Sequence, residues 1–344
     1  MRFLFAICLF VFSLPFAISQ DKFKVACIAF YNFENLFDTL DSPDTDDLEF
    51  TPQGPNLYNS FVYTDKLSHL SRVVSEIGTT YTPDGPALLG VSEIENKSVL
   101  EDFVKQPAIA SRGYQIIHQD SKDGRGVDVA LLYQPKYFTP VEVIYYSLPT
   151  NDPGDSVRYS RDILFAIGKL DGELVGVSVN HWPSRRGGEQ TTAHLRIKAA
   201  EWNRATLDSL AEARGLGKTI VMGDLNDDPI NDSVKKKLNT GRQLDKLEDG
   251  QMYNPFEEFY RKGLGTTAYQ DAWSLFDQII LSHQLAKSDE GFRFYKAAVY
   301  NPPYLTQKTG TFAGYPQRTY SNGVYIGGYS DHFPVYVLLV KPQT

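Results

Sequence analysis

Short apolar runs recur along most of the chain, and clusters of Gly, Pro, Asn and Asp separate them. Most have the length and the content of β-branched and aromatic residues that are typical of strands with at least one buried face. The pattern predicts strands at residues 23–31, 87–91, 114–118, 127–133, 141–146, 162–170, 173–180, 218–222, 275–281, 294–299 and 333–340.

The apolar spacing changes to that of a helix in segments 65–78 and 191–213. Thr64 is placed to cap the start of the first helix, and Gly215 to end the second. Helices set among many strands, several of which follow one another closely, favour an α+β sandwich of two packed, mainly antiparallel sheets with outer helices.

The N-terminus has a different character. After Met1-Arg2, residues 3–16 are almost uninterruptedly apolar, and Ala17-Ile18-Ser19 offers the small residues that a signal peptidase reads. We interpret residues 1–19 as a secretory signal peptide and residues 20–344 as one catalytic domain; an N-terminal membrane anchor is the alternative, although the run is short for a span. The protein is then expected to be secreted or periplasmic, without stable membrane association, and a monomer.

Composition narrows the possible partners. The formal net charge is −8, so the chain has little general attraction for nucleic acid, and any phosphate contact must be local. Cys8 lies in the predicted signal peptide, and Cys27 lies in an apolar run, where it is expected to fill the core rather than form a disulfide.

Polar clusters lie where predicted strands end, and they carry the candidate chemistry. In order, they are Asn32-Phe33-Glu34, Ser92-Glu93, Asn180-His181, Gly223-Asp224-Leu225-Asn226 and Asp331-His332. Extended backbone puts Asp224 and Asn226 on one side, where they could hold an attacking water and a phosphate oxygen. Alternatively, this segment is an acid-rich turn without a catalytic role.

Carboxylates at the ends of buried strands need a partner or a cation. Glu93 suits Mg²⁺ or Mn²⁺, although Glu95 shares its face and could replace it. Asn32 and Glu34 end the first predicted strand and are also two residues apart, so extended backbone would place their side chains on the same side. His332 needs a carboxylate to orient its ring, and Asp277 is the candidate.

His181 is followed by Trp182, Arg185 and Arg186. Guanidinium groups match phosphate and an indole can stack on a base, so these residues are candidates for substrate binding. Arg125 and Asp128 have a less certain role, with Asp128 as a brace for the site. The aromatic-rich segment 301–325 reads as a long loop that could wall the substrate site.

The ordered set resembles the endonuclease/exonuclease/phosphatase superfamily of metal-dependent phosphoesterases, from about Lys24 to Val340. The residues that carry the resemblance are Asn32, Glu93, His181, Asp224, Asn226, Asp277, Asp331 and His332. Segments 32–38 and 126–133 are similar to a secreted bacterial branch described as nuclease-like. Many members have Asp where this chain has Glu34.

The resemblance implies a four-layer α/β sandwich with the site at one end of two packed sheets. It also implies roles for the site residues. Glu93 would bind Mg²⁺ or Mn²⁺, with Asn32, Glu34 and Asp331 nearby. Asp224 would orient or deprotonate the attacking water, with help from Asn226. His332, held by Asp277, would contact the scissile phosphate, and His181 would lie on the opposite side of that phosphate.

We therefore expect a secreted, divalent-metal-dependent phosphodiesterase, first a nuclease acting on DNA or RNA. A phosphatase or phospholipid phosphodiesterase acting on inositol phosphates or sphingomyelin is the alternative within the same fold. A binding module with an inactive site is the alternative from another class.

Overall fold

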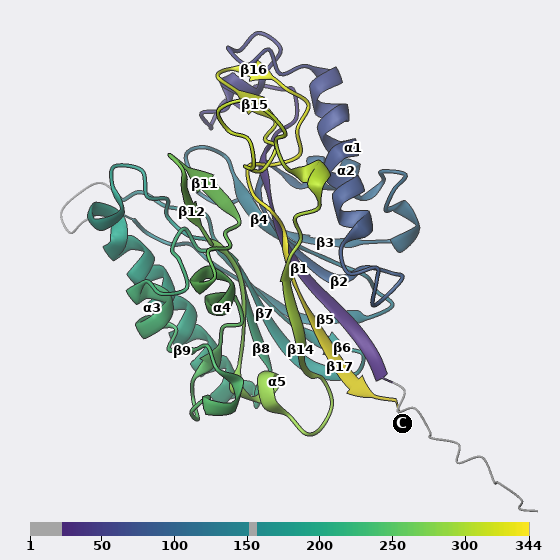
Figure 1. The fold of residues 1–344 in the computed structure, drawn as a ribbon, viewed down its shortest axis with the longest axis vertical. Helices are drawn as coiled ribbons and strands as arrows, with labels where there is room; N and C mark the ends of the chain where they lie inside the picture. Colours follow the sequence, from purple (N-terminus) through teal and green to yellow (C-terminus); the bar gives the residue numbers. More distant parts are fainter. Residues whose placement is uncertain (1–22, 151–156, 344) are drawn as a thin grey trace, which may run out of the picture.

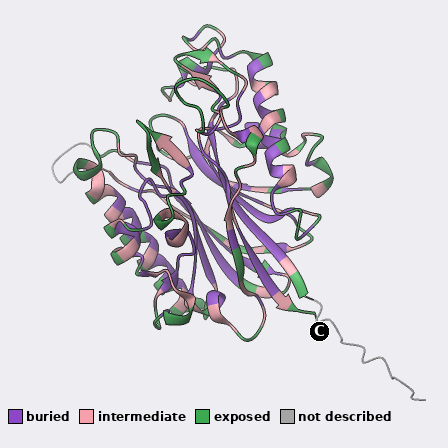
Figure 2. Ribbon diagram, viewed as in Figure 1, coloured by how far each residue is buried: buried purple, intermediate pink, exposed green. Residues whose placement is uncertain are grey.

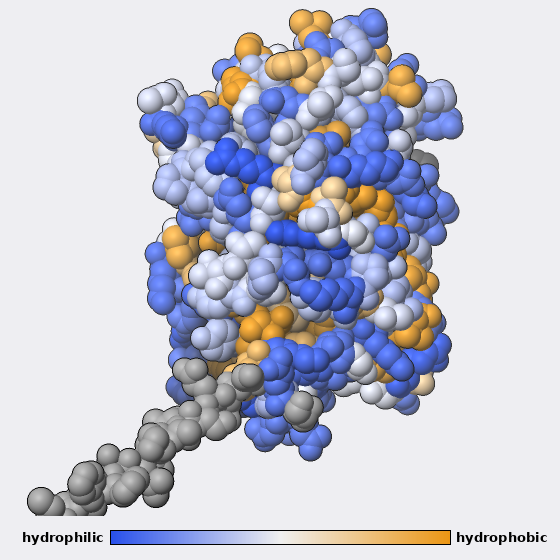
Figure 3. Space-filling model, turned by 90° about the vertical axis from the view of Figure 1, so that its right-hand side faces the viewer, coloured by the Kyte–Doolittle hydropathy of each residue, from blue (hydrophilic) through white to orange (hydrophobic). Residues whose placement is uncertain are grey.

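The computed structural model describes residues 23–150 and 157–343, and the predicted signal peptide lies outside them. Within this part, a sheet of six strands and a sheet of seven pack against each other, and two hairpins stand apart from them (Figure 1). None of the helices in this part combines the length and the apolar character that crossing a membrane requires. On the face drawn in Figure 3, apolar residues form separate groups among hydrophilic ones.

The first sheet contains both ends of the described chain. Only its β1–β2 pair is parallel; the other pairs are antiparallel. Across the sheet the order is β14 (Arg293–Val299), β17 (Val335–Pro342), β1 (Phe23–Leu36), β2 (Pro86–Ile94), β4 (Asp128–Tyr133) and β3 (Gln115–His118).

The second sheet has parallel β7–β8 and β9–β10 pairs, and its other pairs are antiparallel. Its order is β5 (Phe138–Tyr146), β6 (Ile163–Leu170), β7 (Glu173–His181), β8 (Thr219–Asp224), β13 (Asp277–Leu281), β10 (Met252–Tyr253) and β9 (Thr240–Gly241).

Helices cover the outer faces of both sheets, so the molecule has four layers (Figures 1 and 2). α1 (Ser60–Glu76) and α2 (Lys97–Val104) lie on the first sheet, and α3 (Glu189–Arg214) lies on the second. The smaller elements are α4 (Phe256–Arg261), α5 (His283–Lys287), the hairpin β11 (Thr267–Tyr269) with β12 (Ala272–Ser274), the hairpin β15 (Tyr320–Ser321) with β16 (Val324–Tyr325), and single turns at Leu48–Phe50, Ala110–Arg112, Ser233–Lys237, Leu244–Lys246 and Pro303–Leu305.

The layers follow from side-chain alternation along each strand. In β1, Ile28 and Phe30 enter the core between the sheets, whereas Cys27 and Ala29 pack under α1. Cys27 is a buried free cysteine, so its predicted role in the core is confirmed. Both faces of the central strands are buried, which is why their sequences read as continuous apolar runs.

Every strand predicted from the pattern is present, with ends shifted by a few residues. The predicted start of the first helix is wrong: α1 begins at Ser60, where Asn59 accepts hydrogen bonds from the backbone N–H groups of Phe61 and Val62. Thr64 lies inside the helix and its hydroxyl donates to the carbonyl of Ser60. Gly215 ends α3 in a left-handed conformation, as predicted.

Candidate active site

Three neighbouring strands of the second sheet bring polar residues side by side. His181 of β7 lies beside Asp224 of β8, which lies beside Asp277 of β13. Gly223 permits the close approach of β7 and β8, because a Cβ there would lie 2.3 Å from the carbonyl oxygen of Asn180. We call His181, Asp224 and Asp277 the polar row.

His332 reaches the polar row from the loop before β17. Its Nδ1 lies 2.6 Å from Oδ2 of Asp277, and its Nε2 lies 3.9 Å from Oδ2 of Asp224. Ser330 holds this loop: its hydroxyl accepts from the backbone N–H of His332 and donates to the carbonyl of Asn32. The structure therefore pairs His332 with the carboxylate expected from the sequence.

The buried groups at this point differ in their affinity for protons. Burial alone would lower the pKa of His332, but Asp277 and Asp224 outweigh it and raise that pKa well above its ordinary value. Burial lowers the pKa of His181 well below its ordinary value, and the guanidinium of Arg161 adds to this. Burial raises the pKa of Asp224 to about 7. Surroundings that shift the pKa values of neighbouring groups in opposite directions suit separate acid and base roles.

The first sheet supplies the opposite side of the site. The Asn32 amide donates to Oδ2 of Asp224 at 3.1 Å and so joins the two sheets. Oε1 of Glu93 lies 3.8 Å from Nε2 of His181, while its Oε2 accepts from the backbone N–H of Asn35 at 3.0 Å. Asn32 and Glu93 thus meet the polar row across the sandwich.

The choice between Glu93 and Glu95 is decided by the direction of the two side chains. Glu95 accepts from the backbone N–H of Asp38 at 2.6 Å and from the hydroxyl of Ser42 at 3.2 Å. It therefore anchors the acidic 41–47 segment, whereas Glu93 faces His181.

Several site residues have left-handed backbone, which is strained for residues other than glycine. The φ angles are 48° at Glu34, 57° at Glu93 and 50° at Asn226. Each such residue costs on the order of 1 kcal/mol or more and persists only where its surroundings hold it. At Asn226 the holding contacts are hydrogen bonds from its backbone N–H to Asp224 and from its side-chain amide to the carbonyl of Trp182.

Two predicted metal ligands, Glu34 and Asp331, share an ion-pair contact with Arg318. Nη2 of Arg318 lies 2.7 Å from Oδ2 of Asp331, and its Nε lies 3.5 Å from Oε1 of Glu34. The buried ammonium of Lys66 donates to the carbonyl of Glu34 and to the hydroxyl of Thr319, both at 2.6 Å. Sequence reasoning missed Arg318 and Lys66, because one lies in an irregular loop and the other looked like an ordinary polar position of a helix.

The remaining oxygen donors fit a hard divalent cation. Asp224 and Asp277 offer oxygen atoms within 4.8 Å of each other, Asn32 bonds to Asp224, and Glu93 faces His181. Oδ1 of Asp277 is buried and has no hydrogen-bond partner among the described residues. Buried carboxylates at this density need a compensating positive charge, and oxygen ligands suit Mg²⁺ or Mn²⁺.

The structure contradicts the predicted stacking role of Trp182. Its side chain is fully buried and its indole N–H donates to Oδ1 of Asn180. An indole enclosed in the core cannot stack on a substrate. The ring belongs to the apolar cluster under α3, together with Ala199 and Ala200.

Arg185 is likewise a structural residue rather than a free cation. Its guanidinium contacts carboxylate oxygens of Asp227 at 3.3 Å, Asp228 at 3.1 Å and Glu189 at 3.0 Å, and it donates to the carbonyl of Asn226. The predicted phosphate contact is therefore wrong for Arg185, because its donors are already used. Arg186 is exposed.

The two adjacent arginines make a matched pair for a stability test. Arg185→Ala should lower the free energy of unfolding by about 2 kcal/mol, because it leaves the mostly buried Asp228 without its cation, whereas Asp227 keeps its ion pair with Arg196. Arg186→Ala should change it by less than about 0.5 kcal/mol. Denaturant unfolding of both variants measures this, and equal stability of the two would contradict the assignment.

Arg125 and Asp128 lie in different surroundings. Arg125 is exposed and donates to the side-chain oxygen of Asn35 at 2.9 Å, next to Glu34 and Glu93. Asp128 does not brace the polar row: its carboxylate lies 3.1 Å from Nε2 of His118 and accepts from the backbone N–H of Ser121.

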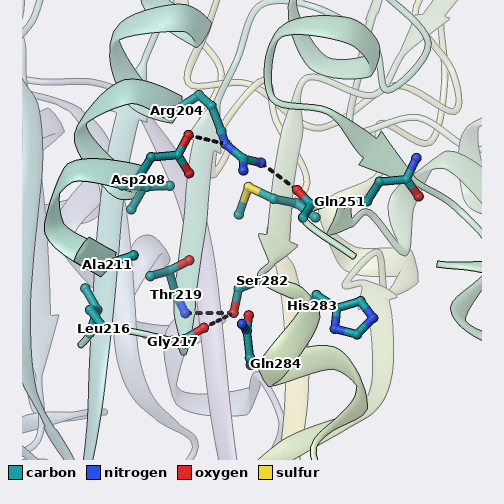
Figure 4. A pocket seen from close by; sticks show the side chains of 13 residues that line it. Arg204, Asp208, Ala211, Leu216, Gly217, Thr219, Gln251, Ser282, His283 and Gln284 are labelled. Carbon is teal, nitrogen blue, oxygen red and sulfur yellow. Dashed lines mark hydrogen bonds and ion pairs between the residues drawn. The ribbon is translucent and has the colours of Figure 1, made fainter. Parts of the chain in front are cut away.

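A pocket of about 170 Å³ lies at the other end of the second sheet (Figure 4). It is lined by Thr219, where β8 begins, whereas Asp224 stands at the last position of that strand. Arg204 and Ser282 also line it, and both are held by local hydrogen bonds. This pocket is therefore separate from the polar row.

Comparisons with known proteins agree with this architecture. A sequence model described as the Endonuclease/Exonuclease/phosphatase family matches residues 27–341. A search of curated proteins found no match.

Solved structures share the fold at low sequence identity. An endonuclease/exonuclease/phosphatase family protein of Bacteroides thetaiotaomicron is 16% identical, with a TM-score of 0.55 over 93% of this chain and 96% of that chain. A mannosyl-6-phosphatase of the same organism is 18% identical, with a TM-score of 0.56 over 92% and 100%. TDP2 of D. rerio, complexed with a single-strand DNA product, is 15% identical, with a TM-score of 0.53 over 92% and 98%.

Proposed function

The chain belongs to the endonuclease/exonuclease/phosphatase family, and from this premise we propose that it is a divalent-metal-dependent phosphodiesterase that hydrolyses nucleic acid. The observation that carries the proposal is the pairing of His332 with Asp277 next to Asp224. Nε2 of His332 and Nε2 of His181 lie 3.9 Å and 3.7 Å from Oδ2 of Asp224, so the acid–base and electrostatic groups that cleavage of a P–O bond needs are gathered at one place.

His332 is the group that stabilises charge on the phosphate. Asp277 accepts the Nδ1 hydrogen bond at 2.6 Å, which fixes the ring so that Nε2–H faces the centre of the site. A non-bridging phosphate oxygen there accepts that hydrogen bond, and the bond strengthens as negative charge develops in the transition state.

Asp224 is the base of the proposed reaction. Water attacks phosphorus, its proton passes to Asp224, and the bond from phosphorus to the leaving oxygen breaks; solvent protonates that oxygen. The amides of Asn32 and Asn226 hold Asp224 in place, through hydrogen bonds of 3.1 Å from the Asn32 side chain and 3.0 Å from the Asn226 backbone.

Glu93 is the first candidate to hold the cation, with Asn32 and Asp224 beside it. A bound Mg²⁺ or Mn²⁺ would supply Lewis-acid stabilisation of phosphate charge. Arg318 competes with a cation for Glu34 and Asp331, because it already contacts one oxygen of each carboxylate.

A polynucleotide is the substrate class that we favour, and TDP2, a protein of the same fold, was crystallised with a DNA product. A phosphatase acting on phosphate monoesters is the second candidate, since the mannosyl-6-phosphatase shares the fold over a similar extent.

One panel separates the candidates. The purified protein is incubated with Mg²⁺ or Mn²⁺ and plasmid DNA, RNA, sphingomyelin, inositol phosphates or mannose 6-phosphate. We expect cleavage of DNA or RNA. Release of phosphate from monoesters alone would replace the nuclease by a phosphatase, sphingomyelin cleavage would support the lipid alternative, and no hydrolysis of any substrate would favour a binding module.

Arg125 is a better candidate than Arg185 for contact with a substrate phosphate, because it is exposed and lies beside the site. Arg125→Ala should raise KM for DNA. It should also reduce the slope of the logarithm of the DNA-binding constant against the logarithm of the salt concentration by about one unit, the effect of losing one phosphate contact. Arg214→Ala, an exposed arginine at the far end of α3, is the control. An unchanged salt slope for Arg125→Ala would remove it from the substrate path.

We also propose export from the cytoplasm. The support is the sequence of residues 1–19, with its apolar run and small residues before residue 20. N-terminal sequencing of the protein from its native host should find a mature chain that begins near Gln20. An intact Met1 on the isolated protein would exclude cleavage there.

A further inference from the structure

A cavity of about 370 Å³ opens between the β11–β12 hairpin and segment 307–318. Both elements lie at the end of the sheets that carries the candidate active site (Figure 1). The proposed chemistry gives no catalytic role to either element, so the cavity needs its own explanation.

Aromatic side chains form much of the lining. Tyr269 is 76% exposed and Phe312 is 42% exposed, and both line the cavity together with Tyr315. The rings of Phe312 and Tyr315 lie 5.5 Å apart. Single exposed aromatic residues are ordinary, but several that converge on one concavity mark a place where a ligand is bound.

The lining is held in place by specific contacts. The hydroxyl of Tyr315 donates to the carboxylate of Asp271 at 2.8 Å and accepts from its backbone N–H at 2.6 Å, so the hairpin tip and the loop are tied together. Gln270 and Asp271 both have positive φ, at 49° and 62°, and form the hairpin turn without glycine. A strained turn that is tied to a facing loop supports a preformed cavity.

The cavity shares residues with the active site. Arg318 and Asp331 line it, and they form the ion pair that also contacts Glu34. The start of the hairpin is joined to the polar row, because the hydroxyl of Thr266 accepts from the backbone N–H of Asp277. A ligand whose phosphate lies at His332 can therefore place an adjoining group in this cavity.

We propose that the cavity binds a nucleobase of the substrate, next to the phosphate that is cleaved. Tyr269 and Phe312 offer ring faces for stacking, and the amides of Gln270 and Gln307 and the charged groups of Arg318 and Asp331 offer polar partners to the edge of a heterocycle. The inference rests on the proposed nuclease function and names a determinant of its specificity.

Tyr269→Ala and Phe312→Ala test the proposal on separate elements. Each should raise KM for a dinucleotide substrate by roughly tenfold, the scale of losing one stacked base, and leave kcat within about twofold. An analogue of the same dinucleotide without the base should be hydrolysed equally well by the variants and the parent. Tyr295→Ala removes an exposed tyrosine of β14 outside the cavity and is the matched control.

Equilibrium binding in EDTA separates this inference from the catalytic proposal. AMP should bind the parent protein more tightly than ribose 5-phosphate does, and the two cavity variants should lose that difference. Equal loss for both ligands would reassign the cavity to a sugar, and unchanged AMP affinity in both variants would overturn the proposal. An inactive protein that still shows the AMP preference would contradict the catalytic function and keep the base site.

Discussion

His332→Ala is expected to lower kcat by at least about 100-fold, the scale of losing an electrostatic or acid–base partner in the transition state. The reason is geometric: Nδ1 is held at 2.6 Å from Asp277, so that Nε2 points toward Asp224 and the proposed position of the phosphate. Steady-state kinetics on the best substrate of the panel measures the loss, and KM should change far less than kcat.

The Asp277→Asn variant supplies the matching control. His332→Ala alone leaves a buried carboxylate without its cation, which costs stability as well as activity. The double variant, His332→Ala with Asp277→Asn, should recover stability but not kcat, because the charge is gone while the catalytic group is still missing. Additive losses of kcat in the double variant would show that the two residues do not act as one unit.

Chelation should abolish hydrolysis, and Mg²⁺ or Mn²⁺ should restore it. Glu93→Gln should reduce activity at saturating metal by at least about 100-fold, because the anionic oxygen that faces the site becomes a neutral amide. Thermal unfolding gives a second readout: the metal should raise the Tm of the parent protein and leave that of Glu93→Gln almost unchanged.

Glu95→Gln is the control for this experiment. Glu95 lies two positions further on but bonds to Asp38 and Ser42, so its variant should keep both the activity and the Tm response to metal. Full hydrolysis in excess chelator, or a metal response retained by Glu93→Gln and lost by Glu95→Gln, would overturn the metal assignment.

The sequence alone determined the longer strands, because alternation and apolar runs report burial of local backbone, and burial is what the sandwich requires. It did not indicate the short strands β9 to β12, β15 and β16, which are too brief to show either pattern. It also identified the residues at the strand ends that meet in the site, since His181, Asp224, Asp277 and His332 belong to one ordered set. The predicted start of α1 is late because Thr64 is a residue type that can cap a helix, and only the structure shows that Asn59 accepts the first backbone N–H groups.

Only the tertiary structure decided which polar side chains are free to act. Trp182 and Arg185 adjoin His181 in sequence, but one is enclosed under α3 and the other is bound by Asp227, Asp228 and Glu189. The structure also showed that Arg318 forms ion pairs with both Glu34 and Asp331 and that a hairpin and a distant loop line an aromatic cavity. These properties depend on contacts between residues far apart in the chain. The local pattern of a sequence records the period and polarity of each segment, but it carries no information about which distant segment will supply a counter-charge or cover a ring.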